Sequence, residues 1–202
     1  MSKLKILNKD TNYSFRSYFE LPHDTDEILA EFGYSFTQAR LQLPRTQRTF
    51  AGLAELQQQI EETLPFVTLT SEAAKREILV APVLSRVAVF SQHILRIEYT
   101  LKLNSMLQGN LDYLIEGDRN LIVIEAKRDD LTRGFTQLAV EMIALAMRED
   151  TNQLIYGVVT MGTVWIFGIL DPETHRITRD ISSYKLPDDL EDLVKILVGI
   201  LE

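Results

Sequence analysis

Three charged side chains in the middle of the chain have the types and spacing of a metal-dependent hydrolytic site. Asp112 belongs to the segment LDYLIE (111–116), and Glu125 and Lys127 belong to LIVIEAK (121–127). Carboxylate oxygens are the ligands that Mg²⁺ and Mn²⁺ prefer. Such a metal activates a bound water and holds a phosphodiester for in-line attack, while a lysine deprotonates the water or stabilises charge on the phosphate. The three residues therefore predict phosphodiester hydrolysis with Mg²⁺ or Mn²⁺ as cofactor.

The two segments are expected to form an antiparallel hairpin, because turn-forming residues separate two runs of strand-like sequence. If the hairpin closes with Glu116 opposite Leu121, Asp112 lies directly opposite Glu125. A slip of two residues would keep both carboxylates on the same face. Lys127 follows Glu125 by two residues, so it is expected to point to that face as well.

The surrounding sequence predicts the elements that hold this hairpin. The predicted helices cover residues 50–62, a segment that contains Glu72, Lys75, Arg76 and Leu79, residues 131–148 and residues 190–201. The predicted strands, besides the two of the hairpin, cover residues 93–103, 154–160 and 164–170. Thr70 or Ser71 can cap the second helix and Pro82 disturbs it. This order of elements is typical of an α/β fold with a central mixed sheet flanked by helices.

The composition limits the classes of protein to which the chain can belong. Hydrophobic residues make up 46% and charged residues 25% of the sequence, as in ordinary globular proteins. The absence of cysteine excludes disulfides, thiolate catalysis and zinc–cysteine sites. The sequence has no signal-peptide pattern, and no apolar run approaches the roughly 20 residues needed to span a bilayer. A cytoplasmic protein without a membrane partner is expected.

The charge balance bears on nucleic-acid binding. The formal net charge of −8 argues against indiscriminate binding to nucleic acid, which usually accompanies a basic balance. Arg40, Arg45 and Arg48 form a local basic group, and solvated surface charge is its simplest interpretation. The three histidines are scattered without metal-ligand spacing and are expected to be structural or exposed. Trp165 is expected to pack in the core or at a sheet edge.

Four patches of sequence, in this order, resemble the PD-(D/E)xK nuclease superfamily. The similarity is greatest to the nuclease domain at the N-terminus of the restriction subunit of type I restriction enzymes. The patches are EAAKREILVAPVL (72–84), GNLDY (109–113), IEAK (124–127) and GFTQLAVEM (134–142). The resemblance implies a restriction-endonuclease-like core over residues 66–202. Residues 1–65 match no pattern of the family and are expected to be an N-terminal elaboration of short strands and a helix packed on that core.

The resemblance also assigns roles to individual residues. Asp112 and Glu125 would be metal ligands and catalytic residues, Lys127 the catalytic lysine, and Gln137 a residue that orients the site or contacts nucleic acid. Glu72 and the backbone carbonyl of Ala126 would complete the metal site. Glu77 competes with Glu72 for the helix position, and Glu72 fits the family spacing better. A first-turn glutamate that suits the helix dipole is the simpler account of Glu72.

The last of the four patches has a simpler account too. Gln137 and Glu141 are four residues apart on a predicted helix, so a hydrogen bond between them on the surface would explain both residues.

The resulting hypothesis is a Mg²⁺-dependent DNA nuclease of the restriction or repair type. The chain carries no Gly-x-x-x-x-Gly-Lys-Ser/Thr loop, so an ATP-driven motor, or a specificity subunit, would be a separate partner. The alternative is a catalytically inactive nuclease-fold module for nucleic-acid binding or protein assembly, which the acidic charge favours. A homodimer that shares the region of Trp165 is a further alternative.

Overall fold

The computed structural model describes residues 6–8, 11–117 and 130–202, and the backbone of residues 121–125. Its strands are β1 (Ser35–Ala39), β2 (Ile94–Lys102), β3 (Gln108–Glu116), β4 (Leu121–Glu125), β5 (Ile155–Thr160), β6 (Val164–Asp171), β7 (Arg176–Asp180) and β8 (Tyr184–Lys185). Its helices are α1 (Phe15–Glu20), α2 (Thr25–Glu31), α3 (Leu53–Thr63), α4 (Glu72–Lys75), α5 (Ala81–Ser91), α6 (Leu131–Glu149) and α7 (Leu190–Leu201). A 3-10 turn, η1 (Leu64–Phe66), follows α3, and a π-helical segment, η2 (Arg76–Val80), joins α4 to α5.

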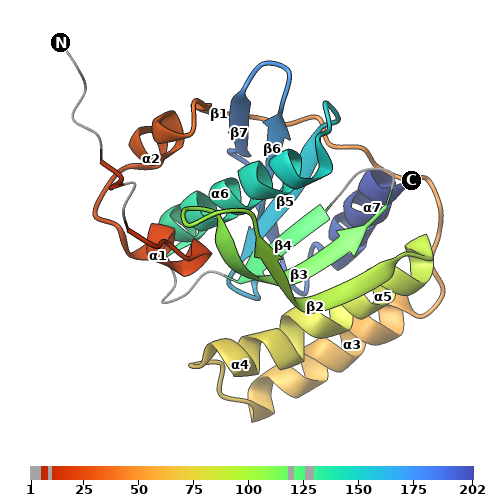
Figure 1. Ribbon diagram of the computed structural model, residues 1–202. Helices are drawn as coiled ribbons and strands as arrows, with labels where there is room; N and C mark the ends of the chain where they lie inside the picture. Colours follow the sequence, from red (N-terminus) through yellow and green to blue (C-terminus); the bar gives the residue numbers. More distant parts are fainter. Residues whose placement is uncertain (1–5, 9–10, 118–120, 126–129) are drawn as a thin grey trace.

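The strands form one mixed sheet in the order β1-β7-β6-β5-β4-β3-β2, and β8 pairs with β6 (Figure 1). The β1–β7 and β4–β5 pairs are parallel and the other pairs are antiparallel. Helix α6 connects the parallel strands β4 and β5, as a parallel pair requires a long crossover. The expected α/β class, a central mixed sheet flanked by helices, is confirmed.

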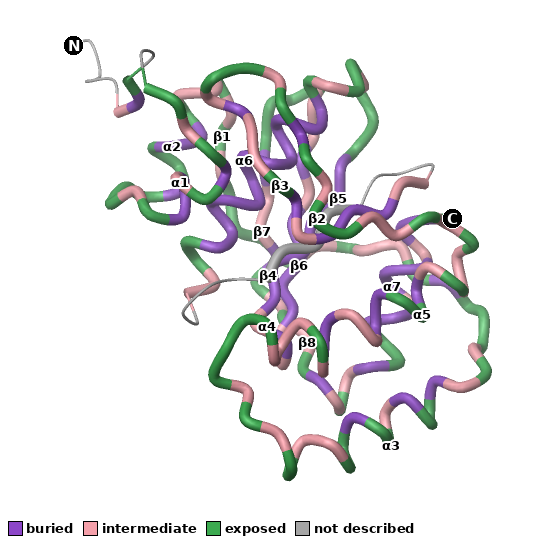
Figure 2. Tube along the Cα trace, turned by 60° about the horizontal axis from the view of Figure 1, so that its bottom comes forward, coloured by how far each residue is buried: buried purple, intermediate pink, exposed green. Residues whose placement is uncertain are grey.

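Two hydrophobic cores lie on the two faces of the sheet. One core is built around α6, which has no exposed face between Gly134 and Ala146, and it includes apolar residues of α1 and α2. The other core packs α3, α5 and α7 against the opposite face. Figure 2 shows long buried stretches along α6 and α7, whereas most of α3 is exposed or half-buried. Residues before 65 thus contribute to both cores and, through β1, to the sheet itself.

The strongly periodic segments form the elements that the sequence predicts. Helix α7 spans Leu190–Leu201, α6 spans Leu131–Glu149 and α3 spans Leu53–Thr63, all within a few residues of expectation. Pro82 does not end the second predicted helix. It lies in the first turn of α5, where its missing N–H is tolerated, and the π-helical turn η2 takes up the irregularity before it. Among the described residues, no helix is long and apolar enough to cross a membrane.

Strand β2 does not alternate regularly, contrary to the prediction. Glu98 has a left-handed backbone (φ 52°), and the β2–β3 ladder pairs Ile97 with Tyr113 and Tyr99 with Leu111 on either side of it. The apolar side chains change faces at this point: Tyr113 belongs to the core of α5 and α7, whereas Leu111 belongs to the core of α6. Leu111 and Tyr113, two residues apart, therefore face different cores, whereas strict period two would place both side chains on one face.

The N-terminal helix α1 packs against the turn between β2 and β3 and the start of β3. Tyr18 donates a hydrogen bond of 2.6 Å to the carbonyl of Met106, and burial raises the pKa of this tyrosine. Gly109 has φ 146°, and a Cβ there would lie 2.8 Å from the ring of Phe15. The glycine in the GNLDY patch is therefore explained by the close packing of α1 on β3.

The extended segment after β1 runs along α7 and is locked to it by backbone contact. The N–H of Thr46 donates to the carbonyl of Lys195 at 3.1 Å. A Cβ at Gly199 would lie 2.7 Å from the Thr46 nitrogen and 2.9 Å from the Arg45 Cα. Because these are backbone atoms, they cannot move aside as a flexible side chain would.

We expect the substitution Gly199→Ala to lower the free energy of unfolding by about 1–3 kcal/mol through overpacking. Helix propensity alone would favour alanine by about 1 kcal/mol, so the two effects have opposite signs. Urea unfolding followed by circular dichroism measures the difference, with Lys195→Ala on the same helix as the control. A variant more stable than the wild type by the roughly 1 kcal/mol of helix propensity would show that the segment does not pack on α7 as described.

Candidate functional site

Asp112 lies in β3 at the point where the strand changes faces, and its side chain is 22% exposed. Its Oδ1 is 3.7 Å from Nη1 of Arg76, the first residue of η2. The same Nη1 donates to Oε1 of Glu98 at 2.7 Å. Arg76 thus links η2, which belongs to the first of the four family-like patches, to β3, which carries Asp112. The sequence predicts no role for this arginine.

Arg76 is held on several sides. Its guanidinium lies 5.1 Å from the ring centre of Tyr113, and its Nε donates to the Tyr113 hydroxyl at 3.4 Å. Burial alone would lower the pKa of Arg76, but the hydrogen bonds to Tyr113 and Glu98 and the charge of Asp112 outweigh it, and the net shift is upward. The arginine is therefore a permanent cation beside Asp112.

The predicted register of the hairpin is wrong by one residue. The β3–β4 ladder pairs Tyr113 with Val123, Leu114 with Ile122 and Ile115 with Leu121. Leu121 therefore does not pair with Glu116, whose backbone pairs with Ile94 in β2. The carboxylate of Glu116 forms ion pairs with Arg96 (2.9 Å) and Arg148 (3.5 Å), outside the turn. The direct pairing of Asp112 with Glu125 does not follow from this ladder, and two-residue slips do not reproduce it either.

Other parts of the expected cluster lie at the limit of the described chain. Glu125 ends β4, and its backbone pairs with Thr160 of β5. The Glu125 side chain, Ala126 and Lys127 lie outside the described residues, so their roles stay predictions. The turn after Thr160 packs against α4, since a Cβ at Gly162 would lie 3.3 Å from the Cβ of Lys75. Helix α4 and the end of β4 are thus both neighbours of the β5–β6 turn.

Helix α6 contributes a buried polar pair, and the charge of Asp112 acts on the carboxyl of that pair. The Gln137 Nε2 donates to Oε1 of Glu141 at 3.0 Å. The hydrogen bond suggested by their spacing exists, but it is not on the surface: Gln137 is 8% exposed and Glu141 is fully buried. Burial raises the pKa of Glu141 well above its ordinary value, the bond from Gln137 opposes the rise, and the charge of Asp112 adds to it. The full burial of Glu141, and the effect of the Asp112 charge on its pKa, are the main features of the site that the sequence does not predict.

The structure separates the two helix carboxylates that compete in the sequence. Glu77 of η2 lines a small hollow together with Gln59 and Thr63 of α3. Glu72 is an exposed first-turn residue of α4, after the Ser71 cap whose Oγ accepts from the Ala74 N–H. The position beside α3 makes Glu77 the weaker candidate for the metal site.

A divalent metal fits the donor set in kind. Within the described residues, no three His, Asp or Glu side chains are gathered closely enough to hold a metal ion. Asp112 supplies a half-buried carboxylate, and Oε2 of the buried Glu141 accepts no hydrogen bond from the described part of the chain. Hard oxygen donors of this type suit Mg²⁺ or Mn²⁺. The fit is one of chemistry, and it requires further ligands beyond Asp112.

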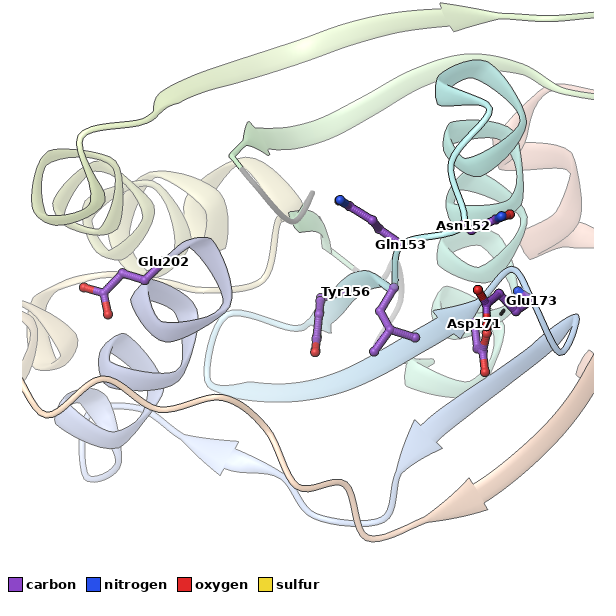
Figure 3. Close-up of a pocket in the computed structure, with 7 residues that line it drawn as sticks. Asn152, Gln153, Tyr156, Asp171, Glu173 and Glu202 are labelled. Carbon is purple, nitrogen blue, oxygen red and sulfur yellow. Dashed lines mark hydrogen bonds between the residues drawn. The ribbon is translucent and has the colours of Figure 1, made fainter.

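A separate open hollow of about 610 Å³ lies at the opposite end of β5 (Figure 3). Its lining includes Tyr156, Asp171, Glu173 and Glu202. Asp171 accepts hydrogen bonds from the backbone of Glu173 and from Thr174, which lower its pKa, and Glu202 pairs with Arg48 at 2.9 Å. The carboxylates of Asp171 and Glu202 already have partners within the fold. The hollow is therefore a weaker candidate for a functional site than the cluster of Asp112, Arg76 and Glu98, called here the Asp112 cluster.

The tryptophan, the arginines and the histidines considered in the sequence have contacts within the fold. Trp165 is fully buried and its Nε1 donates to the Gly162 carbonyl at 2.8 Å, so the expectation that it packs in the core is confirmed. The homodimer that would share this region stays a prediction. Arg45 pairs with Asp192 of α7, in keeping with the interpretation of the basic group as surface charge. His23 pairs with Glu27, and the His175 ring stacks near Tyr34.

Comparison of the chain with protein-family models, with curated proteins and with solved structures found no match. The function of the Asp112 cluster is therefore argued from its residues and their geometry.

Proposed function

We propose that the chain is a metal-dependent nuclease of the restriction or repair type, which hydrolyses phosphodiester bonds in DNA with Mg²⁺ or Mn²⁺. One observation carries the proposal: Asp112 meets Arg76 from the first helix at 3.7 Å and lies within electrostatic range of the buried Glu141 on α6. Three of the four family-like patches thus converge on one aspartate. The mixed sheet with α6 between parallel strands is compatible with a restriction-endonuclease-like core.

In this proposal each residue has a distinct task. Asp112 and Glu125, with Glu72 and the carbonyl of Ala126, would hold the metal, which supplies an activated water and charge neutralisation at the phosphate. Lys127 would take a proton from the water or stabilise the phosphate charge. Gln137 is buried and bonded to Glu141, so it would orient the site rather than contact nucleic acid.

The direct test is cleavage of labelled single- and double-stranded DNA and RNA by the purified protein. We expect cleavage of DNA with Mg²⁺ or Mn²⁺ and none after metal removal with EDTA. We also expect Lys127→Ala to lower kcat about 10²–10⁴-fold, the range for loss of a proton-transferring group. The proposal fails if the wild type cuts none of these substrates, or if Lys127→Ala cuts as fast as the wild type.

The second candidate is an inactive nuclease-fold module that binds nucleic acid or assembles with a partner protein. The net charge of −8, and the ion pairs that occupy Arg45 and Arg48, favour it. A titration with Mn²⁺ separates the two candidates, because the inactive module requires no metal binding that depends on Asp112 and Glu125. A separate motor or specificity subunit remains part of the nuclease proposal.

A further inference from the structure

Arg76 begins a π-helical turn at the place where the first helix reaches the sheet. The segment η2 (Arg76–Val80) carries one extra residue per turn, and such turns are frequent where a side chain is redirected at a functional site. The Arg76 side chain is 24% exposed. It is neither a buried structural arginine nor a freely solvated one, and its charge lies at the surface beside Asp112.

The contacts of Arg76 fix the guanidinium but leave part of it available. Tyr113 lies against its plane, and Glu98 and Asp112 engage Nη1. Its hydrogen bonds and ion pairs to described residues use Nε and Nη1, although a guanidinium carries five N–H donors. The Nη2 edge is therefore the part that can bind an external acceptor.

Glu98 is held in an uncommon conformation for this contact. Its φ of 52° places a non-glycine residue in the left-handed region, in the middle of a strand. Oε1 of Glu98 lies 2.7 Å from Nη1 of Arg76, whereas Oδ1 of Asp112 lies 3.7 Å from the same nitrogen. Arg76 therefore keeps a carboxylate partner of its own when the charge of Asp112 is used by another cation.

We propose that Arg76 binds a phosphate of the DNA strand at the Asp112 site, with Glu98 and Tyr113 as its positioning residues. This inference rests on the proposed function. A divalent ion held by Asp112 would neutralise the carboxylate that faces Arg76, and the guanidinium would then offer its donors to an anion beside the site. The planar fork of arginine matches two phosphate oxygens, which a lysine cannot do. The alternative is an arginine that only ties η2 to the β2–β3 hairpin.

The test measures binding of a short fluorescein-labelled DNA duplex, and of its single strand, by fluorescence anisotropy in Ca²⁺. Arg76→Ala is expected to weaken binding about ten- to a hundred-fold, as for a lost charge-assisted hydrogen bond. Arg76→Lys, which keeps the charge, should fall between the two. The slope of log Kd against log salt should decrease by about one for Arg76→Ala, since one phosphate contact is lost. Glu98→Gln should weaken binding less and leave that slope unchanged.

Arg96→Ala is the matched control. Like Arg76, Arg96 pairs with a glutamate, at 2.9 Å, and lies over a tyrosine ring, at 5.5 Å, but it belongs to β2 and its partners are Glu116 and Tyr99. The Arg96→Ala variant should bind DNA with the same Kd as the wild type and with the same slope of log Kd against log salt. Thermal unfolding of each variant shows whether it folds, and Arg76→Lys remains informative if Arg76→Ala does not.

The outcomes separate this inference from the proposed function. Binding that depends on Arg76 without cleavage under any condition supports the inference and refutes the nuclease. Cleavage by the wild type with equal Kd and salt slope for Arg76→Ala refutes the inference and leaves the nuclease intact. Equal losses in Arg76→Ala and Arg96→Ala, or no DNA binding by the wild type, also overturn the inference. Stronger binding of labelled RNA than of DNA would refute DNA as the ligand.

Discussion

Asp112→Asn will abolish metal-dependent cleavage, with a loss of roughly a thousand-fold or more, because a metal supplies several kcal/mol of transition-state stabilisation. The substitution preserves the size of the side chain and removes the negative charge that a divalent cation requires. The ion pair with Arg76 is long and partly exposed, so the free energy of unfolding should change little, by about 0–1 kcal/mol. Cleavage assays and Mn²⁺ titration by calorimetry should therefore report losses that thermal unfolding does not.

Glu116→Gln provides the matched control for this prediction. Glu116 lies on the same strand, is 32% exposed and pairs with arginines, as Asp112 does, but its partners Arg96 and Arg148 are outside the site. The control should retain metal binding and cleavage. If Asp112→Asn binds Mn²⁺ as tightly as the wild type, Asp112 is not a metal ligand. If both variants lose activity equally, the loss reflects the ion-pair network of β3 and not a site.

The sequence predicts best the long elements whose apolar residues recur with a clear period. Helices α6 and α7 have long apolar stripes, and their bounds follow from the period of 3.6. Helices α1 and α2 and strand β7 are absent from the prediction, and β1 is covered only by the general expectation of short strands before residue 65. Their short segments are defined by contacts with distant parts of the chain, such as the parallel pairing of Ser35 with Arg176, and no local pattern encodes such a partner.

The site was predictable in its composition but not in its geometry. The types Asp112, Glu125 and Lys127 suggest a metal-dependent hydrolase, yet the register that joined them assumed that the hairpin closes with Glu116 opposite Leu121. The ladder instead pairs Leu121 with Ile115, one position away from expectation. An arginine four positions after Glu72 and a glutamate four positions after Gln137 carried only weak signals. Their proximity to Asp112 depends on the tertiary packing of η2 and α6.

The buried glutamate on α6 should make the stability of the protein depend on pH in a particular direction. Burial, with a contribution from the charge of Asp112, raises the pKa of Glu141 in the folded state above its ordinary value. The carboxyl therefore stays protonated in the folded protein at pH values where the unfolded chain has released the proton. Its contribution to stability is complete below the ordinary glutamate pKa and is lost as pH rises toward the raised value.

We expect Glu141→Gln to remove this dependence. Glutamine has the shape of the protonated acid, its Oε1 can still accept from Gln137, and it does not titrate. Within the window, wild-type stability should fall with a limiting slope of about 1.4 kcal/mol per pH unit, and the variant should lack that slope. The variant becomes the more stable protein as pH rises. Urea unfolding at a series of pH values measures the difference, with Glu55→Gln on the exposed face of α3 as the control.

The direction of this difference also tests whether Glu141 and Asp112 form one electrostatic unit. Because the charge of Asp112 helps to raise the pKa of Glu141, Asp112→Asn should narrow the pH window in which Glu141 remains protonated. The double variant Asp112→Asn, Glu141→Gln should then show the pH dependence of Glu141→Gln alone. If the wild type and Glu141→Gln have parallel stability curves, Glu141 is ionised in the folded state, and the buried acid beside Asp112 has a compensating partner.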